Sequence, residues 1–246
     1  MVYFVEIFNE RKNEIEEFIN TMILIEQKND KKRSIEGKTE FQDFFSNDKG
    51  EVPIAYQTMI NILKSNVILM LYNIIEFTIT GLIDAIYSAI KGEELTYVDV
   101  NKKIQQIWTR SMIKVMKDPN SNQNTFFKKS KEMIDHIIEK RVLNLYAKQL
   151  LSTGNLDGVQ IIKTLEEHGI RYDTTNENYR PDKLEYVKTK RNELAHGSIS
   201  FTEALRNVTI NDISEDKTII FSFLENLIEV LKKYTNDREY RNAKKA

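Results

Sequence analysis

The chain has 246 residues, of which 30% are charged and 41% hydrophobic, with only three prolines and eight glycines; this composition favours long helices and argues against an all-β fold. It has no cysteine, which excludes disulfides and thiolate zinc sites and fits a reducing compartment, so a cytoplasmic protein is expected. The net charge of −1 supplies no global positive field, so any contact with nucleic acid must be local.

The first predicted helix covers residues 3–29. Its apolar side chains recur mainly every three or four residues, with Glu and Lys between them, as in an amphipathic helix: Phe4, Phe8, Ile15, Phe18, Met22 and Ile25. The segment lacks the basic start and the small-residue cleavage site of a signal peptide. Residues 29–51 are charged and contain two glycines, which predicts a loop with a short helical turn at 41–45.

A long helix is predicted from Pro53 to about Lys91. Its middle is apolar enough to resemble a membrane span, but polar residues form a stripe along it, and we therefore expect no membrane insertion. At ~100° per residue, the stripe comprises Asn66, Asn73, Thr80, Asp84 and Lys91, with Glu76 ~60° to its side. Two interpretations are open: a solvated face, or an internal polar cleft reached by Asn73 and Glu76.

Two further helices are predicted in the middle of the chain. The first begins at a cap, Thr96 or Asp99, and runs to about Lys117, before the Asp-Pro-Asn sequence that ends it. The second covers 124 to about 151 and stops at the Ser-Thr-Gly sequence that follows.

A short helix is predicted from about 156 to 168, with Gly169 as its stop, and another from Pro181 to Gly197. Residues 208–210 suit a brief extended piece, and apolar residues at helical spacing from 221 to 231 predict a final helix.

The whole chain is expected to form one helical domain, residues 1–246. Residues 92–170 are a candidate helical insertion within it, and residues 238–246 form a basic tail that we expect to be flexible.

The three histidines, His136, His168 and His196, lie in different segments. No pair has the i,i+3 or i,i+4 spacing of a helical metal site, so we expect no metal site and no cofactor. The glycine-rich sequences of phosphate-binding loops are absent as well, which excludes a P-loop nucleotide hydrolase. His136 and His168 are interpreted as helix-surface or helix-end residues without a function, and the Lys/Arg residues between 128 and 141 as a solvated face.

His196 differs because polar residues surround it. Asn192 lies one turn before it on the same helix face, and Arg191 lies ~140° around the helix. Arginine offers a permanent charge and a fork that matches phosphate oxygens, and histidine can transfer a proton near neutral pH. Together they suggest RNA cleavage by attack of the 2′-OH, with Lys188 and Lys190 as candidate RNA-binding residues. Because RxxxxH occurs often in charged helices, a purely structural role is the competing interpretation.

The segment from Lys190 to Gly197, Lys-Arg-Asn-Glu-Leu-Ala-His-Gly, resembles the motif of the HEPN superfamily, in which an Arg and a polar residue precede a His. Looser likeness to one defence and toxin–antitoxin branch of that superfamily lies at residues 71–76, 152–157, 168–170, 200–201 and 234–240. The resemblance implies an all-α HEPN-like bundle with long antiparallel helices and additional inserted helices.

The resemblance also implies a metal-independent endoribonuclease that leaves a 2′,3′-cyclic phosphate and acts as a homodimer with the two motifs facing one cleft. Arg191 would bind the scissile phosphate, His196 would transfer protons and Asn192 would orient the site. Asn73 or Glu76 would add a polar residue from an earlier helix.

We therefore expect a toxin of prokaryotic antiviral defence or of a toxin–antitoxin system, with RNA as substrate and an antitoxin or sensor protein as a further partner. The alternative is a non-catalytic helical module that binds RNA or protein. The apolar faces at 62–90 and 219–231 are either dimer contacts or intrachain core.

Overall fold

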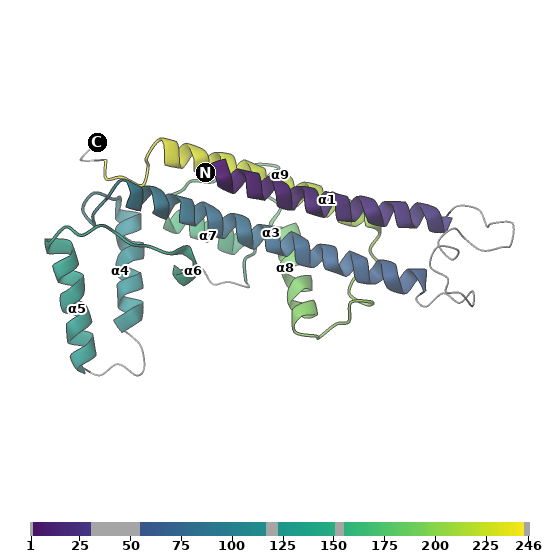
Figure 1. Ribbon diagram of the computed structural model, residues 1–246, viewed down its shortest axis with the longest axis horizontal. Coiled ribbons are helices and arrows are strands. Elements are labelled where there is room, and N and C mark those ends of the chain that lie inside the picture. The colour runs from purple at the N-terminus through teal and green to yellow at the C-terminus, as the bar shows by residue number, and fades with distance from the viewer. Residues whose placement is uncertain (1, 31–54, 117–122, 151–154, 244–246) are drawn as a thin grey trace. The chain divides into compact units, whose positions relative to one another are not determined.

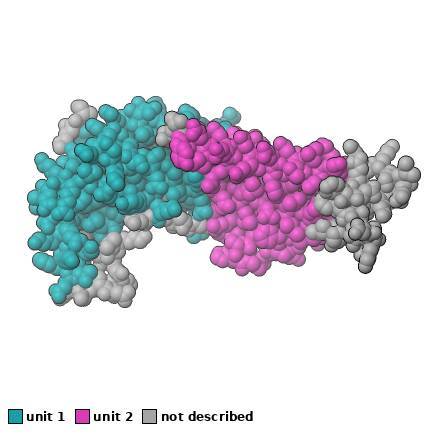
Figure 2. All heavy atoms as spheres, in the orientation of Figure 1, with its two compact units in different colours: residues 1, 76–179, 224–246 teal, residues 2–75, 180–223 magenta. Residues whose placement is uncertain are grey.

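A computed structural model describes residues 2–30, 55–116, 123–150 and 155–243 (Figure 1). In these ranges the chain is helical, with isolated β-bridges and no strand, which confirms the all-α prediction. The long α3, Tyr56–Gly92, and α9, Ile210–Asn236, each contribute to two compact units (Figure 2). Unit 1 contains residues 76–179 and 224–246, and unit 2 contains residues 2–75 and 180–223.

In unit 2, α1, Val2–Asp30, packs against the first half of α9. Lys12 lies over the Phe221 ring, 5.3 Å from its centroid, and Lys217 pairs with Glu16 at 3.7 Å. Higher numbers on α1 thus meet lower numbers on α9, so the two helices are antiparallel. Of the apolar stripe predicted for this helix, Phe8, Ile15 and Met22 are buried, and Ile19, which was not predicted, is buried with them.

Helix α3 supplies core residues to both units. Its buried side chains include Ile68, Leu71, Tyr72 and Ile75 in unit 2 and Ile79, Leu82, Ile86 and Ile90 in unit 1. Among the described helices it is the one long and apolar enough to cross a membrane by length and composition, and 56% of its most apolar window is buried within the protein. Such burial is compatible with the core helix of a soluble protein. The apolar faces at 62–90 and 219–231 likewise lie largely in the intrachain core.

The polar residues of the α3 stripe differ in exposure. Asn73 and Lys91 are exposed, Asn66 and Thr80 are half-buried, and the Asp84 carboxylate accepts the backbone N–H of Ala147 at 3.0 Å. The solvated-face interpretation therefore holds for Asn73. The start of the helix at Pro53, and the loop and turn predicted at 31–51, lie outside the described residues.

Helix α4, Lys102–Met116, begins later than predicted. Thr96 and Asp99 close a turn of their own, because the Asp99 Oδ2 accepts from both the backbone N–H and the hydroxyl of Thr96. Asn101 is the cap instead, and its Oδ1 accepts the Ile104 N–H at 2.9 Å.

The prediction of one helix over 124–151 was wrong. Helix α5, Gln123–Ile138, ends before Lys140, which has a positive φ of 51°. The chain then runs extended, with a bridge between Thr96 and Val142, before the short α6, Ala147–Leu150. The buried residues that follow α5, Leu143, Leu145 and Ala147, alternate with exposed ones. That period of two indicates extended chain and not helix.

Helix α7, Gly158–Glu167, and α8, Pro181–Ala195, lie where they were predicted, and Gly169 after α7 has a φ of 79°. The extended piece predicted at 208–210 was wrong at Ile210, where α9 already begins. Thr209 and Asp212 cap one another there through side-chain and backbone hydrogen bonds of 2.8 to 3.1 Å. This capping box, Thr-x-x-Asp, was the overlooked signal.

The described part of the predicted tail, residues 238–243, packs on unit 1. Tyr240 is buried and donates to the Glu93 carboxylate at 3.0 Å, and Arg238 and Arg241 pair with the same carboxylate. The backbone of Arg241 also forms an isolated antiparallel β-bridge with that of Val100. These contacts hold the segment in place through residue 241.

Within unit 1 a buried histidine links α3, α7 and α9. His168 is 3% exposed; its Nδ1 lies 2.7 Å from the Thr164 carbonyl and its Nε2 lies 2.6 Å from the Tyr87 hydroxyl. A carbonyl can only accept, so Nδ1 carries the proton and Nε2 accepts from Tyr87. The Tyr234 hydroxyl donates to the His168 carbonyl at 2.8 Å. Burial lowers the pKa of His168 below 6.5, which favours the neutral ring.

We predict that His168 makes folding pH-dependent below about pH 6.5, the ordinary histidine value. The unfolded chain binds a proton there that the folded chain resists, so stability contributed by neutral His168 is present above that pH and is lost as pH falls. Its share is at most about 1.4 kcal/mol per pH unit. The measurement is the urea-unfolding free energy at pH 8, 6.5 and 5.5.

A His168→Gln variant should lose less stability than the wild type over this range, although it is less stable at pH 8. Tyr87→Phe, which keeps the imidazole but removes the donor to Nε2, should show a smaller pH slope than the wild type. Parallel curves for wild type and His168→Gln would contradict the assignment.

Candidate functional site

The candidate motif lies at the carboxyl end of α8, in unit 2. Pro181 occupies the first helical turn, where its missing N–H and fixed φ are tolerated. The other end closes with a Schellman motif: the Gly197 N–H donates to the Leu194 carbonyl at 3.2 Å and the Ser198 N–H to the Glu193 carbonyl at 3.0 Å. Gly197 has a φ of 69°, the left-handed conformation that this motif requires.

His196 is the C-cap residue of α8 and its side chain is exposed. Its backbone N–H still donates to the Asn192 carbonyl at 3.0 Å, so the residue keeps helical geometry while the chain turns away at Gly197. The helix end therefore presents the imidazole to solvent on a well-defined backbone.

Arg191 is half-buried and oriented by two neighbours. Its guanidinium carbon lies 4.4 Å from the centroid of the Tyr72 ring, and Tyr72 is completely buried in α3. Its Nη1 donates to the Asn192 Oδ1 at 2.9 Å. A guanidinium stacked on an aromatic face gains a cation–π attraction of about 0.5–2 kcal/mol. Asn192, predicted to orient the site, thus contacts Arg191 directly.

The two candidate RNA-binding lysines are both engaged with carboxylates on α8. Lys190 pairs with Glu193 at 2.8 Å and Lys188 with Glu185 at 3.6 Å. Each is mostly buried, with 24% and 17% of the side chain exposed. The structure therefore shows no open basic surface at these two positions.

The loop after the motif is held by polar side chains of α3. Asn61 donates to the Thr202 carbonyl at 3.1 Å and Ser65 to the Phe201 carbonyl at 2.7 Å. The Lys64 ammonium, in a side chain only 4% exposed, donates to the Leu205 and Val208 carbonyls at 2.8 and 2.7 Å. Burial lowers the pKa of Lys64 from its ordinary value. We call Asn61, Lys64 and Ser65 the α3 clamp.

Sequence reasoning missed Tyr72 and the α3 clamp as parts of this region. The clamp residues lie ~80–180° around the helix from the middle of the polar stripe, among apolar neighbours. A lysine inside an apolar helix face was the available signal, since such a group must find buried acceptors.

The two supporting residues predicted from α3 differ in exposure and in the unit to which they belong. Asn73 follows Tyr72, is exposed and belongs to unit 2 with the motif. Glu76 is half-buried and belongs to unit 1.

The other two histidines contact neighbouring side chains; His168 lies at a helix end, as predicted, but is buried. His168 is buried in the network of unit 1, and His136 stacks on Trp108 with 5.0 Å between ring centroids. Among the three histidines, all of which the structure describes, His196 alone has an exposed side chain.

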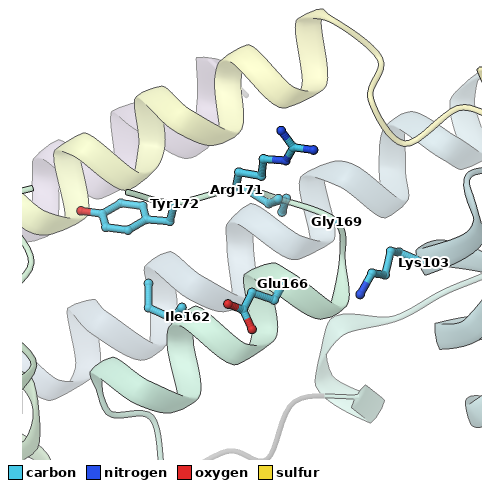
Figure 3. Close-up of a pocket in the computed structure, with 7 residues that line it drawn as sticks. Lys103, Ile162, Glu166, Gly169, Arg171 and Tyr172 are labelled. Atoms are coloured by element: carbon cyan, nitrogen blue, oxygen red, sulfur yellow. The ribbon is translucent and has the colours of Figure 1, made fainter. Parts of the chain in front are cut away.

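A separate cavity of about 630 Å³ opens in unit 1 (Figure 3). Lys103, Glu166, Arg171 and Tyr172 line it, together with apolar residues of the α7 region. It contains none of the predicted site residues, and its charges are of both signs. In the part of the chain that was described, no three His, Asp or Glu residues gather as a metal site would need.

Fold and site together define a class: helical proteins in which an Arg-Asn pair precedes an exposed His at a helix end. The family model described as MAE_28990-like HEPN matches residues 5–240, and the chain belongs to this HEPN family, as its motif predicted. The match covers both compact units. No curated protein and no solved structure matched the chain.

We predict that Gly197→Ala lowers the free energy of unfolding by about 1 kcal/mol, because an L-residue is strained in the left-handed conformation. Nothing lies within 4 Å of an added Cβ at Gly197, so a clash would not contribute. Gly92→Ala is the matched control: its Cβ also meets nothing, and its φ is not positive. That variant should be as stable as the wild type or more so in urea titrations. Equal losses in the two variants would contradict the role given to φ.

Proposed function

We propose that the chain is a metal-independent endoribonuclease of HEPN type. The HEPN superfamily contains many ribonucleases, and the chain carries the Arg-Asn-x3-His motif of that superfamily intact. We place its activity in prokaryotic antiviral defence or in a toxin–antitoxin system, in line with the branch that its sequence resembles.

The chemistry divides between the motif residues. His196 takes the proton of the 2′-OH or supplies one to the leaving 5′-oxygen. The 2′-oxygen attacks the adjacent phosphorus, the bond to the 5′-oxygen breaks, and the products are a 2′,3′-cyclic phosphate and a 5′-hydroxyl. Arg191 binds the phosphate oxygens with its planar fork and stabilises the added negative charge. Asn192 keeps the guanidinium in place.

The observation that carries this proposal is the exposure of His196 on a fixed helix end. A histidine that transfers protons to substrate must be reachable, whereas His136 and His168 are stacked or buried. The competing function is a non-catalytic module that binds RNA or protein. The pairing of Lys188 and Lys190 with carboxylates weighs against RNA contact at these two positions and so favours the protein-binding form of this alternative.

We also propose that the active form is a homodimer. Cleavage benefits from a base at the 2′-OH and an acid at the 5′-oxygen, yet each chain offers one exposed histidine. A two-fold axis would bring a second His196 and a second Arg191 to the same phosphate.

We predict that the purified chain cleaves total RNA in the presence of EDTA and that His196→Ala reduces cleavage by at least about 100-fold, the usual contribution of a proton-transfer residue. The fold should be unaffected, because His196 is exposed and its removal opens no cavity. Cleavage is followed by gel, fold by circular dichroism. His136→Gln is the matched control and should retain activity wherever it remains folded.

Arg191→Lys tests the second role in the same assay. Lysine keeps the charge but loses the stacked, two-pronged geometry, so a strong loss of cleavage is expected. Retained cleavage in His196→Ala would exclude the proposed proton transfer. Activity lost in EDTA and restored by Mg²⁺ would indicate a carboxylate site instead.

For the homodimer we predict that cleavage per wild-type chain falls as His196→Ala chain is added. A fixed amount of wild-type chain is co-refolded with increasing His196→Ala chain, and cleavage per wild-type chain is measured. A shared site lowers this quantity as mixed dimers replace wild-type dimers, whereas independent sites keep it constant. Subunit exchange is confirmed with two affinity tags, and a flat curve despite exchange would contradict the composite site.

A further inference from the structure

Helix α5 carries large apolar side chains that the described residues leave exposed. Phe127 is 72% exposed, Ile134 51% and Ile138 72%. Exposed apolar groups scattered singly need no explanation, but a contiguous set indicates a contact surface. At ~100° per residue these three lie within ~40° of one another on the helix.

The opposite face of α5 packs inside unit 1. His136 lies ~180° from Phe127 around the helix, and its ring stacks on Trp108 of α4. Trp108 in turn packs edge-on against Tyr97 at 5.3 Å. Figure 1 shows α5 beside α4. One face is therefore anchored by aromatic contacts, and the face bearing Phe127, Ile134 and Ile138 points away from them.

The exposed residues follow the seam of a coiled coil. Phe127, Lys131, Ile134 and Ile138 are spaced four, three and four residues apart, the d-a-d-a order of a heptad repeat. We call these four residues the α5 seam. Lys131, itself exposed, is the one charged member, at an a position. A single polar residue at such a position selects the partner and the register.

We propose that the α5 seam is a docking surface for an α-helix of another protein, one with an apolar stripe and a carboxylate that faces Lys131. Charge complementarity carries this choice. Lys131 would be enclosed by the contact, and a lysine removed from water needs an opposite charge.

A second copy of the chain fits less well. In a parallel pair Lys131 would face its own counterpart, and in an antiparallel pair centred on the seam it would face Ile134. A lipid surface also fits less well, because membrane-surface helices have broad apolar faces flanked by cations. The flank of the seam carries Asp135 as well as Lys128, so it is not uniformly cationic.

The inference is independent of the proposed nuclease. The seam lies in unit 1 and the Arg-Asn-x3-His motif in unit 2, so seam variants should leave RNA cleavage, if present, unchanged. Binding and cleavage are thus separate measurements, and failure of one leaves the other standing.

The test uses the full chain and two synthetic three-heptad peptides with leucine along the seam. The central seam position is Glu in one peptide and Lys in the other, and each labelled peptide is used where sedimentation shows it to be monomeric. Binding is measured by fluorescence anisotropy. We expect the Glu peptide to bind at least about tenfold more tightly than the Lys peptide.

Variants of the chain make the test specific. Lys131→Glu should reverse the preference for the two peptides, and the double variant Phe127→Ser/Ile138→Ser should lose binding. Lys163→Glu, an exposed lysine on α7, is the matched control and should behave as the wild type. Circular dichroism confirms that each variant is folded.

Four results would overturn the proposal: no binding of either peptide, equal binding of both, binding that survives the double serine variant, or no reversal with Lys131→Glu. Self-association of the chain that Phe127→Ser abolishes would assign the seam to a second copy. Binding to vesicles containing phosphatidylglycerol that the double variant abolishes would assign it to a membrane.

Discussion

The buried ammonium of Lys64 constrains the whole region behind the candidate site. Removing a charge from water costs several kcal/mol unless strong hydrogen bonds replace the solvent. The Leu205 and Val208 carbonyls provide them, and Asn61 and Ser65 hold the preceding carbonyls in the same way. Movement of the loop away from α3 would break these hydrogen bonds. Since the loop begins directly after the Gly197 turn, the clamp limits where the end of α8 can go.

Helix α3 is an apolar core helix that also carries polar side chains, two properties that conflict in an ordinary helix. It is apolar enough to resemble a membrane span, yet it carries polar groups on several sides. The polar groups are accommodated in different ways: Asn73 is exposed to solvent, Asp84 accepts a backbone N–H, and Lys64 donates to loop carbonyls. The same helix offers the Tyr72 ring on which Arg191 stacks. Core formation and orientation of the motif therefore depend on one element.

Local signals in the sequence predicted the helices where caps and periodicity agree. Gly169 and Gly197 marked the ends of α7 and α8 because the left-handed conformation strongly favours glycine. The prediction failed at 139–146, where a lysine, Lys140, adopts positive φ and the burial period changes to two. The motif residues were recognised from their pattern. Tyr72 and the α3 clamp were not, because their contacts join residues more than 100 positions apart and no local rule encodes them.

The arrangement around Arg191 explains why a half-buried arginine suits this position. A long side chain loses up to about 2 kcal/mol of rotamer freedom when it is fixed. Here the Tyr72 ring and the side-chain Oδ1 of Asn192 hold the guanidinium in the folded chain, before any ligand arrives. Lysine could not be held in the same way, because its ammonium has neither a plane to stack nor a fork to align. The orientation of the positive charge is thus settled by folding, and an anion bound beside it meets a group that is already in place.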